Sequence, residues 1–359
     1  NSGSSSQSLF FMFKFIVVAL CFLGHCAMAL KCNGHESLCA RKYNNITYLA
    51  THNSYAYTKN VGSTQQYPII SQLDHGVRAL KLTTAKPGRW SNSSEHNVQV
   101  CHTMCEILDA GPLENNLDII ANWLKQNPHE VLTIMMNNIG DFHSRDLEPV
   151  FKASKIMPYL YVKQRYTHNW PTLQKMIESN KRLVVFLDIG ADPSEVSWIN
   201  HQFEYMWETP YNNFGPSEFN CEIDRPEDPK EPNEMMYLMN HFLYGVFSIG
   251  DDIKVPMPQP GKAEDTNSNL LNQHVSNCSQ LTARHPNFIE VDFYDMGNAM
   301  EQINQLNGVP EVQRAKPRGS AGRIVRISTV HASNATPSQP CISRIASLAA
   351  ASVLLMLSL

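Results

Sequence analysis

Two histidines, His52 and His102, each follow a short apolar run of the kind that forms buried strands. An imidazole near neutral pH can take a proton from one oxygen while a second imidazole gives a proton to another. Such a pair suits cleavage of a phosphodiester without a metal. For His102 the alternative is a core histidine held in place by its cysteine neighbours.

Four more polar side chains stand where other apolar runs end. These are Asn137, Asp188, His241 and Asp292. A single polar residue after a strand is usually an ordinary loop residue, but six strand ends marked in this way indicate a site. We expect Asn137, Asp188 and His241 to bind substrate.

Lys81 lies within the apolar run Val77–Thr83. If Leu80 and Leu82 face outward, alternation turns Lys81 inward, where a cation can stabilise charge on a phosphate oxygen. The opposite register would leave Lys81 outside as a solvated charge. We expect the inward register and a role in substrate binding.

To bring these residues together, the strands that precede them must end at the same edge of one sheet. The sequence shows strand patterns that alternate with helix patterns. Helical patterns fall at Leu113–Asn127, Ser194–Trp207 and Gly297–Leu306. Strands are predicted at Ile46–Thr51, Val77–Thr83, Val98–Cys101, Val131–Asn137, Leu183–Asp188, Met236–Asn240 and Phe288–Phe293, with a weaker one at Tyr159–Val162.

This alternation predicts an α/β fold, a single TIM-type (β/α)₈ barrel over residues 30–308. In such barrels the chemistry lies at the carboxyl ends of the strands, where the polar residues stand. Tyr211–Asn233 is rich in Pro, Asn and Glu and is predicted to be an insertion loop, and residues 309–334 are predicted to form a stalk.

The two ends of the chain are expected to be processed. Residues 1–29 contain one Lys, an apolar run and the Ala27-Met28-Ala29 pattern of a cleavage site, which together predict a secretory signal. Residues 335–359 have the order of a GPI-anchor signal, attached at about Asn334; a short transmembrane tail or a buried helix is the alternative. We therefore expect a secreted protein held at the cell surface.

Nine cysteines become six once both ends are removed, and an even number suits an oxidising compartment. The pairings we expect are Cys32–Cys39, Cys101–Cys105 and Cys221–Cys278. A zinc site at Cys101, His102 and Cys105 is the alternative. Four N-glycosylation motifs, at Asn45, Asn92, Asn277 and Asn334, agree with secretion.

Composition excludes some classes of function. The chain has 359 residues, 17% of them charged, and a formal net charge of −4. A nucleic-acid-binding surface needs clustered basic residues, so we expect no nucleic-acid partner.

Several segments resemble the phosphatidylinositol-specific phospholipase C X-domain superfamily of phosphodiesterases, most closely its secreted fungal-type branch. They extend from about Cys32 to Leu306. The matching segments are ATHNSYA (Ala50–Ala56), QLDHGVRALKLTT (Gln72–Thr84), the long CHTMCEILDAGPLENNLDIIANWLKQNPHEVLTI (Cys101–Ile134), RLVVFLD (Arg182–Asp188), FEYMWETP (Phe203–Pro210) and NFIEVDFY (Asn287–Tyr294).

The resemblance implies roles for particular residues. His52 matches the general base that deprotonates the inositol 2-hydroxyl, His102 matches the general acid that protonates the leaving diacylglycerol oxygen, and Asp292 matches a supporting carboxylate. The implied product is a cyclic inositol phosphate. Two positions depart from the bacterial pattern, since Asn53 replaces an Asp and Thr83 replaces a phosphate-binding Arg. Asn53 is expected in the substrate site, and Lys81 could compensate for the missing Arg.

Calcium-dependent relatives place carboxylates at the ends of early strands. Here those positions hold Asn53, Lys81, Thr83 and Asn137, so we expect no metal and no cofactor. The function implied is a phosphoric diester hydrolase acting on a phospholipid or a glycosylphosphatidylinositol at a membrane surface. One alternative is an inactive barrel serving as a surface or wall protein. The other is a metal-dependent glycerophosphodiesterase or sphingomyelinase D-like enzyme.

Overall fold

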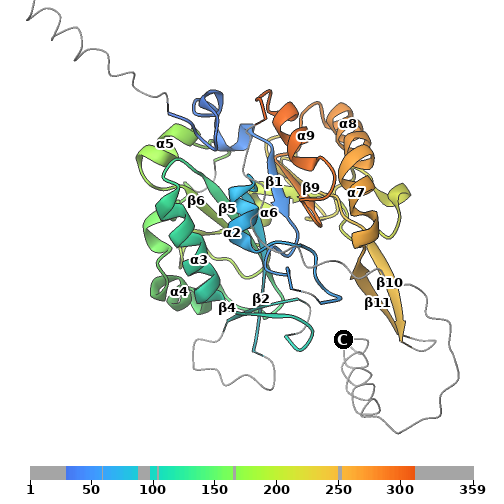
Figure 1. Ribbon diagram of the computed structural model, residues 1–359. Helices are drawn as coiled ribbons and strands as arrows, with labels where there is room; N and C mark the ends of the chain where they lie inside the picture. The colour runs from blue at the N-terminus through green and yellow to red at the C-terminus, as the bar shows by residue number, and fades with distance from the viewer. Residues whose placement is uncertain are drawn as a thin grey trace, which may run out of the picture. The chain divides into compact units, whose positions relative to one another are not determined.

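The computed structural model describes residues 30–311 except for 59, 88–97, 103–104, 165–166 and 250–252 (Figure 1). All of the described residues belong to one compact unit. The predicted secretory signal, the anchor signal and residues 312–334 of the predicted stalk lie outside the described residues. No helix in the described ranges has the length and apolar character needed to cross a bilayer.

Eight parallel strands curl into a TIM-type barrel, as the alternation of elements predicts. Their spatial order is β7-β6-β5-β2-β1-β12-β9-β8, and within the described chain no strand pairing joins β7 to β8, so the barrel has an open seam there. The strands are β1 (Tyr48–Thr51), β2 (Ala79–Ala85), β5 (Leu132–Asn138), β6 (Leu183–Leu187), β7 (Ile199–His201), β8 (Met206–Glu208), β9 (Met236–Asn240) and β12 (Phe288–Val291).

Helices cover the outside of this sheet (Figure 1). The longest, α3 (Leu113–Gln126), carries Leu113, Leu117, Ile120 and Leu124 at helical spacing, and all four are buried. The other helices are α2 (Ile69–Asp74), α4 (Ser144–Ala153), α5 (Leu173–Glu178), α6 (Gln202–Tyr205), α7 (Ala263–Asp265), α8 (Leu271–Thr282) and α9 (Ala299–Leu306), with a π-helical segment at Thr266–Leu270 before α8.

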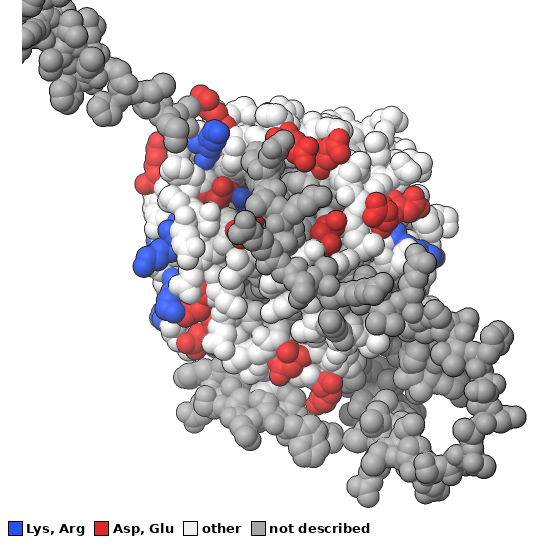
Figure 2. All heavy atoms as spheres, viewed as in Figure 1, with Lys and Arg blue, Asp and Glu red and all other residues white. Residues whose placement is uncertain are grey.

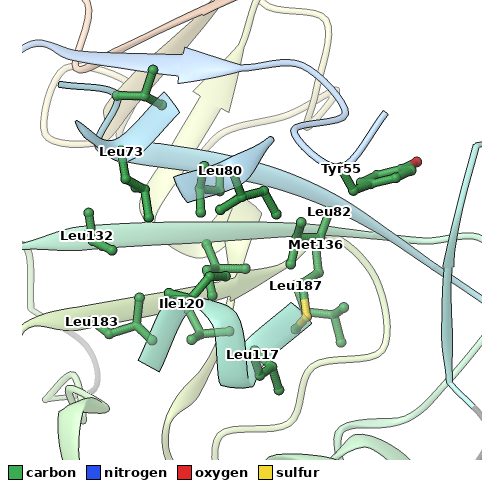
Figure 3. Packing of buried hydrophobic residues seen from close by; sticks show 14 of the residues in the cluster. Tyr55, Leu73, Leu80, Leu82, Leu117, Ile120, Leu132, Met136, Leu183 and Leu187 are labelled. Carbon is green, nitrogen blue, oxygen red and sulfur yellow. The ribbon is translucent and has the colours of Figure 1, made fainter. Parts of the chain in front are cut away.

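The register of β2 decides where Lys81 lies. Leu80 and Leu82 pack outward with Leu117 and Ile120 of α3, in a buried cluster that also includes β5 and β6 (Figure 3). Ala79 belongs to the other buried cluster, which fills the barrel interior. The inward register predicted for Lys81 is therefore confirmed, since its ammonium pairs inside with Glu290 of β12.

Two antiparallel additions extend the barrel. β3 (Gln99–Cys101) pairs with the end of β2 and with β4 (Asp109–Pro112), and β10 (Tyr244–Ile249) forms a hairpin with β11 (Ile253–Pro258). The interpretation of Val98–Cys101 as a barrel strand is therefore wrong. His102 reaches the site from this extension and not from the end of a barrel strand.

Two further predictions are wrong. The predicted helix Ser194–Trp207 contains β7, the four-residue α6 and most of β8, because the apolar residues there pack as short strands of the barrel wall. The predicted weak strand Tyr159–Val162 contributes only an isolated bridge between Leu160 and Leu183, next to a 3₁₀ turn.

Three disulfides join Cys32 to Cys39, Cys101 to Cys105 and Cys221 to Cys278, as predicted. The alternative zinc site at Cys101 and Cys105 is excluded in this state because both sulfurs are bonded to each other. The third disulfide ties the Tyr211–Asn233 insertion to α8. That insertion is largely irregular, with one 3₁₀ turn at Pro216–Glu218.

Candidate active site

His52 follows β1, and Asp292 follows the neighbouring strand β12. Their side chains meet inside the barrel mouth, with His52 Nδ1 2.8 Å from Asp292 Oδ1. Both are almost fully buried. Burial lowers the pKa of His52 to about 4 and raises the pKa of Asp292 well above its ordinary value, because a charge on either group loses hydration. Phe242 stacks on the His52 ring with 4.0 Å between centroids, which fixes its plane.

The backbone turns sharply after both residues. Asn53 and Phe293, which follow His52 and Asp292, have φ angles of 41° and 46°. An aromatic residue rarely adopts this left-handed conformation, and strain of this kind concentrates at functional sites. The segment Thr64–Gln65 holds both turns, since Thr64 Oγ1 and Gln65 Nε2 donate to the carbonyl of His52, and Phe293 N–H donates to the carbonyl of Thr64.

Asn53 orients the other nitrogen of His52. Its Nδ2 lies 3.0 Å from His52 Nε2, and its Oδ1 accepts hydrogen bonds from the hydroxyls of Thr83 and Tyr55. An amide that donates to Nε2 leaves that nitrogen unprotonated. The two departures from the bacterial pattern, Asn53 and Thr83, are thus hydrogen-bonded to each other.

His102 lies beside this group. Its side chain is buried, and its backbone N–H donates to the carbonyl of Leu108. Burial, together with the charge on the neighbouring His52, lowers the pKa of His102 to about 4. The two imidazoles therefore interact electrostatically.

Lys81 and Glu290 form an ion pair inside the barrel, with 3.4 Å between Nζ and Oε2. Burial by itself lowers the pKa of Lys81, but Glu290, Glu208 and Asp188 outweigh burial and raise it above the ordinary value. The ammonium is therefore charged. The same pair acts on His52, whose pKa Glu290 raises and Lys81 lowers.

A second ion pair lies at the open seam. Arg225, from the insertion, places Nε 2.6 Å and Nη2 2.5 Å from Glu208 Oε1. Asp188 Oδ1 accepts hydrogen bonds from the backbone N–H groups of Asn138 and Ile189, and its Oδ2 faces Arg225 Nη1 at 3.9 Å.

Some of the buried polar atoms that lack a hydrogen-bond partner in the described structure lie at this mouth. They are His102 Nδ1, Asp292 Oδ2 and Asn137 Oδ1, together with Glu290 Oε2, which has its ion pair with Lys81 but no hydrogen bond. Folded proteins leave few such atoms unpaired, because each costs about 1–3 kcal/mol. Those of His102 and Asp292 belong to the two-histidine group itself, where polar groups of a ligand could bind them.

His241 does not face the mouth. It is fully buried, with Nδ1 2.9 Å from His274 Nδ1 of α8 and Nε2 2.8 Å from the carbonyl of Thr266. The expectation that His241 binds substrate is therefore wrong. With His274 and Phe219, which stacks on His274, it holds the insertion against α8.

Sequence reasoning missed Glu290, Glu208 and Arg225. Alternation along Phe288–Val291 could have placed Glu290 inward, two residues before Asp292. Glu208 follows directly after the segment that was misread as a helix. Arg225 stands in a loop with no periodic pattern, so only the fold brings it to the site.

Two cysteine-containing groups in the described chain have their donor atoms close together, Cys221 with His274 and Cys278, and Cys101 with Cys105 and Asp109. In both, the sulfurs are already bonded in disulfides. At the barrel mouth, the ammonium of Lys81 stands among the carboxylates. That donor set does not fit calcium, which needs several oxygens and no neighbouring cation.

On the face shown in Figure 2, acidic and basic side chains of the described chain are interspersed over a mostly uncharged surface. This face presents no continuous basic field among its described residues.

The sequence matches the PI-PLC X domain family (PI-PLC X 1) over residues 38–307. A PI-PLC X domain-containing protein 1 of Arthroderma benhamiae is 30% identical over 294 residues, covering 79% of this chain and 91% of that protein. An uncharacterized secreted protein of the same fungus is 33% identical over 288 residues, 77% of this chain. The aligned part spans only 62% of that relative.

The fold is similar to that of the phosphatidylinositol-specific phospholipase C from Listeria monocytogenes. The TM-score is 0.50 at 16% identity, over 75% of this chain and 95% of the bacterial one. A double mutant of the Staphylococcus aureus enzyme gives a TM-score of 0.50 at 13% identity, over 76% of this chain and 95% of that enzyme. At this identity the similarity concerns the fold, whereas the family match rests on the sequence. The chain belongs to the PI-PLC X domain family and has its TIM-type barrel fold.

Proposed function

We propose that the protein is a phosphoric diester hydrolase of the phospholipase C type that works by two-histidine acid–base catalysis. The observation that carries this proposal is the His52–Asp292 pair at the barrel mouth with the buried imidazole of His102 beside it. His52 Nε2 is the base, Asp292 is a positioning residue, and His102 is the acid.

In this reaction a hydroxyl of the lipid headgroup takes the place of the Asn53 amide at His52 Nε2. The hydroxyl proton moves to Nε2, and the oxygen forms a bond to phosphorus. The bond between phosphorus and the glycerol oxygen breaks, and a proton from His102 goes to that oxygen. The products are a cyclic phosphodiester and a neutral diacylglycerol, so atoms and charge balance.

Asp292 stabilises the imidazolium that forms. Burial by itself raises the pKa of Asp292, but a positive charge on His52, at hydrogen-bond distance and out of water, favours the ionised form of this carboxyl as the proton moves to His52. Lys81 supplies a fixed positive charge near the reacting phosphate, which supports the same step. The headgroup class we propose is a phosphoinositide or a glycosylphosphatidylinositol, in line with the names of the bacterial neighbours.

A second candidate is a barrel that binds a surface ligand without turnover. The Asn53 amide already occupies His52 Nε2, and Thr83 stands where bacterial members carry a phosphate-binding Arg. These two features favour this candidate. This second candidate predicts that the protein binds lipid headgroups but does not cleave the lipids.

The secreted fungal relative supports an extracellular location. Attachment through a GPI anchor at about Asn334 is part of the same proposal. Release of the protein from cell membranes by an anchor-cleaving lipase would test it.

The function is tested with the purified segment 30–334 and a panel of phospholipids in mixed micelles. The enzyme proposal predicts turnover of inositol-containing lipids and its loss in His52→Ala. Binding of the same lipids without products would favour the second candidate instead.

A further inference from the structure

The seam between β7 and β8 is where the insertion Tyr211–Asn233 enters the barrel. Glu208 N–H donates to the carbonyl of Arg225, and Asp224 N–H donates to the carbonyl of Glu208, both at 2.9 Å. These bonds form an antiparallel bridge on the edge of β8 that β9 leaves free. The insertion thus adds a short piece of backbone to the open seam and brings the Arg225 side chain to the mouth.

The guanidinium of Arg225 is held rigidly. Two of its nitrogens bind Glu208 Oε1, and its plane lies over the rings of Phe203 and Tyr211, at 5.1 and 4.9 Å from their centroids. Glu208 has no exposed surface, whereas the Arg225 side chain keeps 30% of its surface exposed. Its third nitrogen, Nη1, therefore has a fixed position but makes no hydrogen bond to Glu208.

Asp188 stands opposite, at the end of β6. Two backbone N–H groups fix its Oδ1, so Oδ2 has a defined position 3.9 Å from Arg225 Nη1. That distance is too long for a hydrogen bond. One hydroxyl oxygen could lie within hydrogen-bond distance of both atoms, accepting from Nη1 and donating to Oδ2.

The charge around this gap selects among ligands. Glu208, Asp188 and Glu290 surround two cations, Arg225 and Lys81, and these carboxylates repel an additional phosphate. A hydroxyl, which is both donor and acceptor, suits a guanidinium facing a carboxylate.

We propose that Arg225 Nη1 and Asp188 Oδ2 form a hydroxyl clamp that determines headgroup specificity, carried to the barrel by the insertion loop. Its ligand is a hydroxyl of a cyclic polyol, either on a lipid headgroup or free in solution. The proposal rests on the proposed function for its place in catalysis, but polyol binding can be measured without turnover.

The experiment compares Arg225→Gln and Asp188→Asn with a matched control, Arg284→Gln. Arg284 is also half-buried and ties the far end of the same insertion, through the carbonyls of Pro232 and Met235, but it lies away from the clamp. Thermal unfolding of each variant establishes that it folds. Asp188→Asn keeps the Oδ1 acceptor, so it serves if Arg225→Gln does not fold.

Two measurements distinguish the failure of the clamp from the failure of the proposed hydrolase activity. Binding of free myo-inositol is measured by calorimetry, and KM and kcat are measured on an inositol lipid. Both clamp variants should weaken inositol binding and raise KM about 10- to 100-fold, as for a lost charged hydrogen bond. The value of kcat should fall much less, and Arg284→Gln should behave like wild type.

Equal binding by wild type and the clamp variants would overturn the clamp while leaving the enzyme proposal intact. An equal loss in Arg284→Gln would overturn it as well, since the effect would then be a general loosening of the loop. Arg225-dependent inositol binding by a wild-type protein that cleaves no lipid would support the clamp and contradict the function. Absence of both binding and cleavage would overturn both.

Discussion

His52 Nδ1 lies 2.8 Å from Asp292 Oδ1, although 240 positions separate the two residues in the chain. The parallel pairing of β1 with β12 brings them together, because Thr51 and Val291 are register partners and the next residue of each strand enters the mouth. The first and last strands of the barrel thus supply the two halves of the proposed catalytic unit.

Asp292→Asn tests that unit. The asparagine amide can donate to Nδ1 and so favour the tautomer that carries a proton on Nε2, which removes the base. We expect about a 10²- to 10⁴-fold loss of kcat with the fold intact. Asp295→Asn, at an exposed position three residues on, should retain activity. A normal rate in Asp292→Asn would show that Asp292 does not hold the tautomer.

The activity should be greatest at acidic pH. In the proposed mechanism His52 acts when neutral and His102 when protonated, and the pKa of each buried imidazole is lowered to about 4. The rate should therefore rise with pH as His52 loses its proton and fall again as His102 loses its proton. Because the two rings interact, the apparent values belong to the pair. A pH profile of kcat/KM should peak well below neutrality; a maximum above pH 7 would contradict these roles.

The Lys81–Glu290 pair should tune the base. Glu290 raises the pKa of His52, so Glu290→Gln lowers it and moves the acid limb of the pH profile to lower pH. Lys81 lowers the same pKa, so Lys81→Met should move the limb to higher pH. If the acid limb moved in the same direction in Glu290→Gln and in Lys81→Met, the two substitutions would be acting through a general disturbance of the barrel.

Removal of metal should leave the rate unchanged. The ammonium of Lys81 lies among Glu290, Glu208 and Asp188, at a place where a divalent cation would be repelled. Assays with EDTA and with added calcium test this directly. Loss of turnover with the chelator and its recovery with calcium would favour the metal-dependent alternative.

Much of this architecture could be predicted from the sequence. A long apolar run such as Leu183–Leu187 predicts a buried strand, and the apolar spacing in α3 predicts a helix. The three disulfide pairings follow from the spacing of the cysteines and an oxidising compartment. Alternation along β2 placed Lys81 correctly.

The rest depended on tertiary context. β7 and β8 have only three residues each, too few to show a period, so the apolar residues around them resembled a helix. His241 and Asp188 both follow apolar strands, and only packing against α8 shows that His241 turns away. Arg225 reaches the mouth through pairing with β8, which no local pattern indicates.

The central claim is cleavage by His52 and His102 through a cyclic phosphodiester. The most direct test is phosphorus NMR of an inositol lipid incubated with wild type, His52→Ala and His102→Ala. We predict that a cyclic phosphate signal appears with wild type and that each substitution slows it about 10²- to 10⁴-fold without unfolding the protein. Equal product formation by all three proteins, or hydrolysis with no cyclic intermediate, would contradict the account.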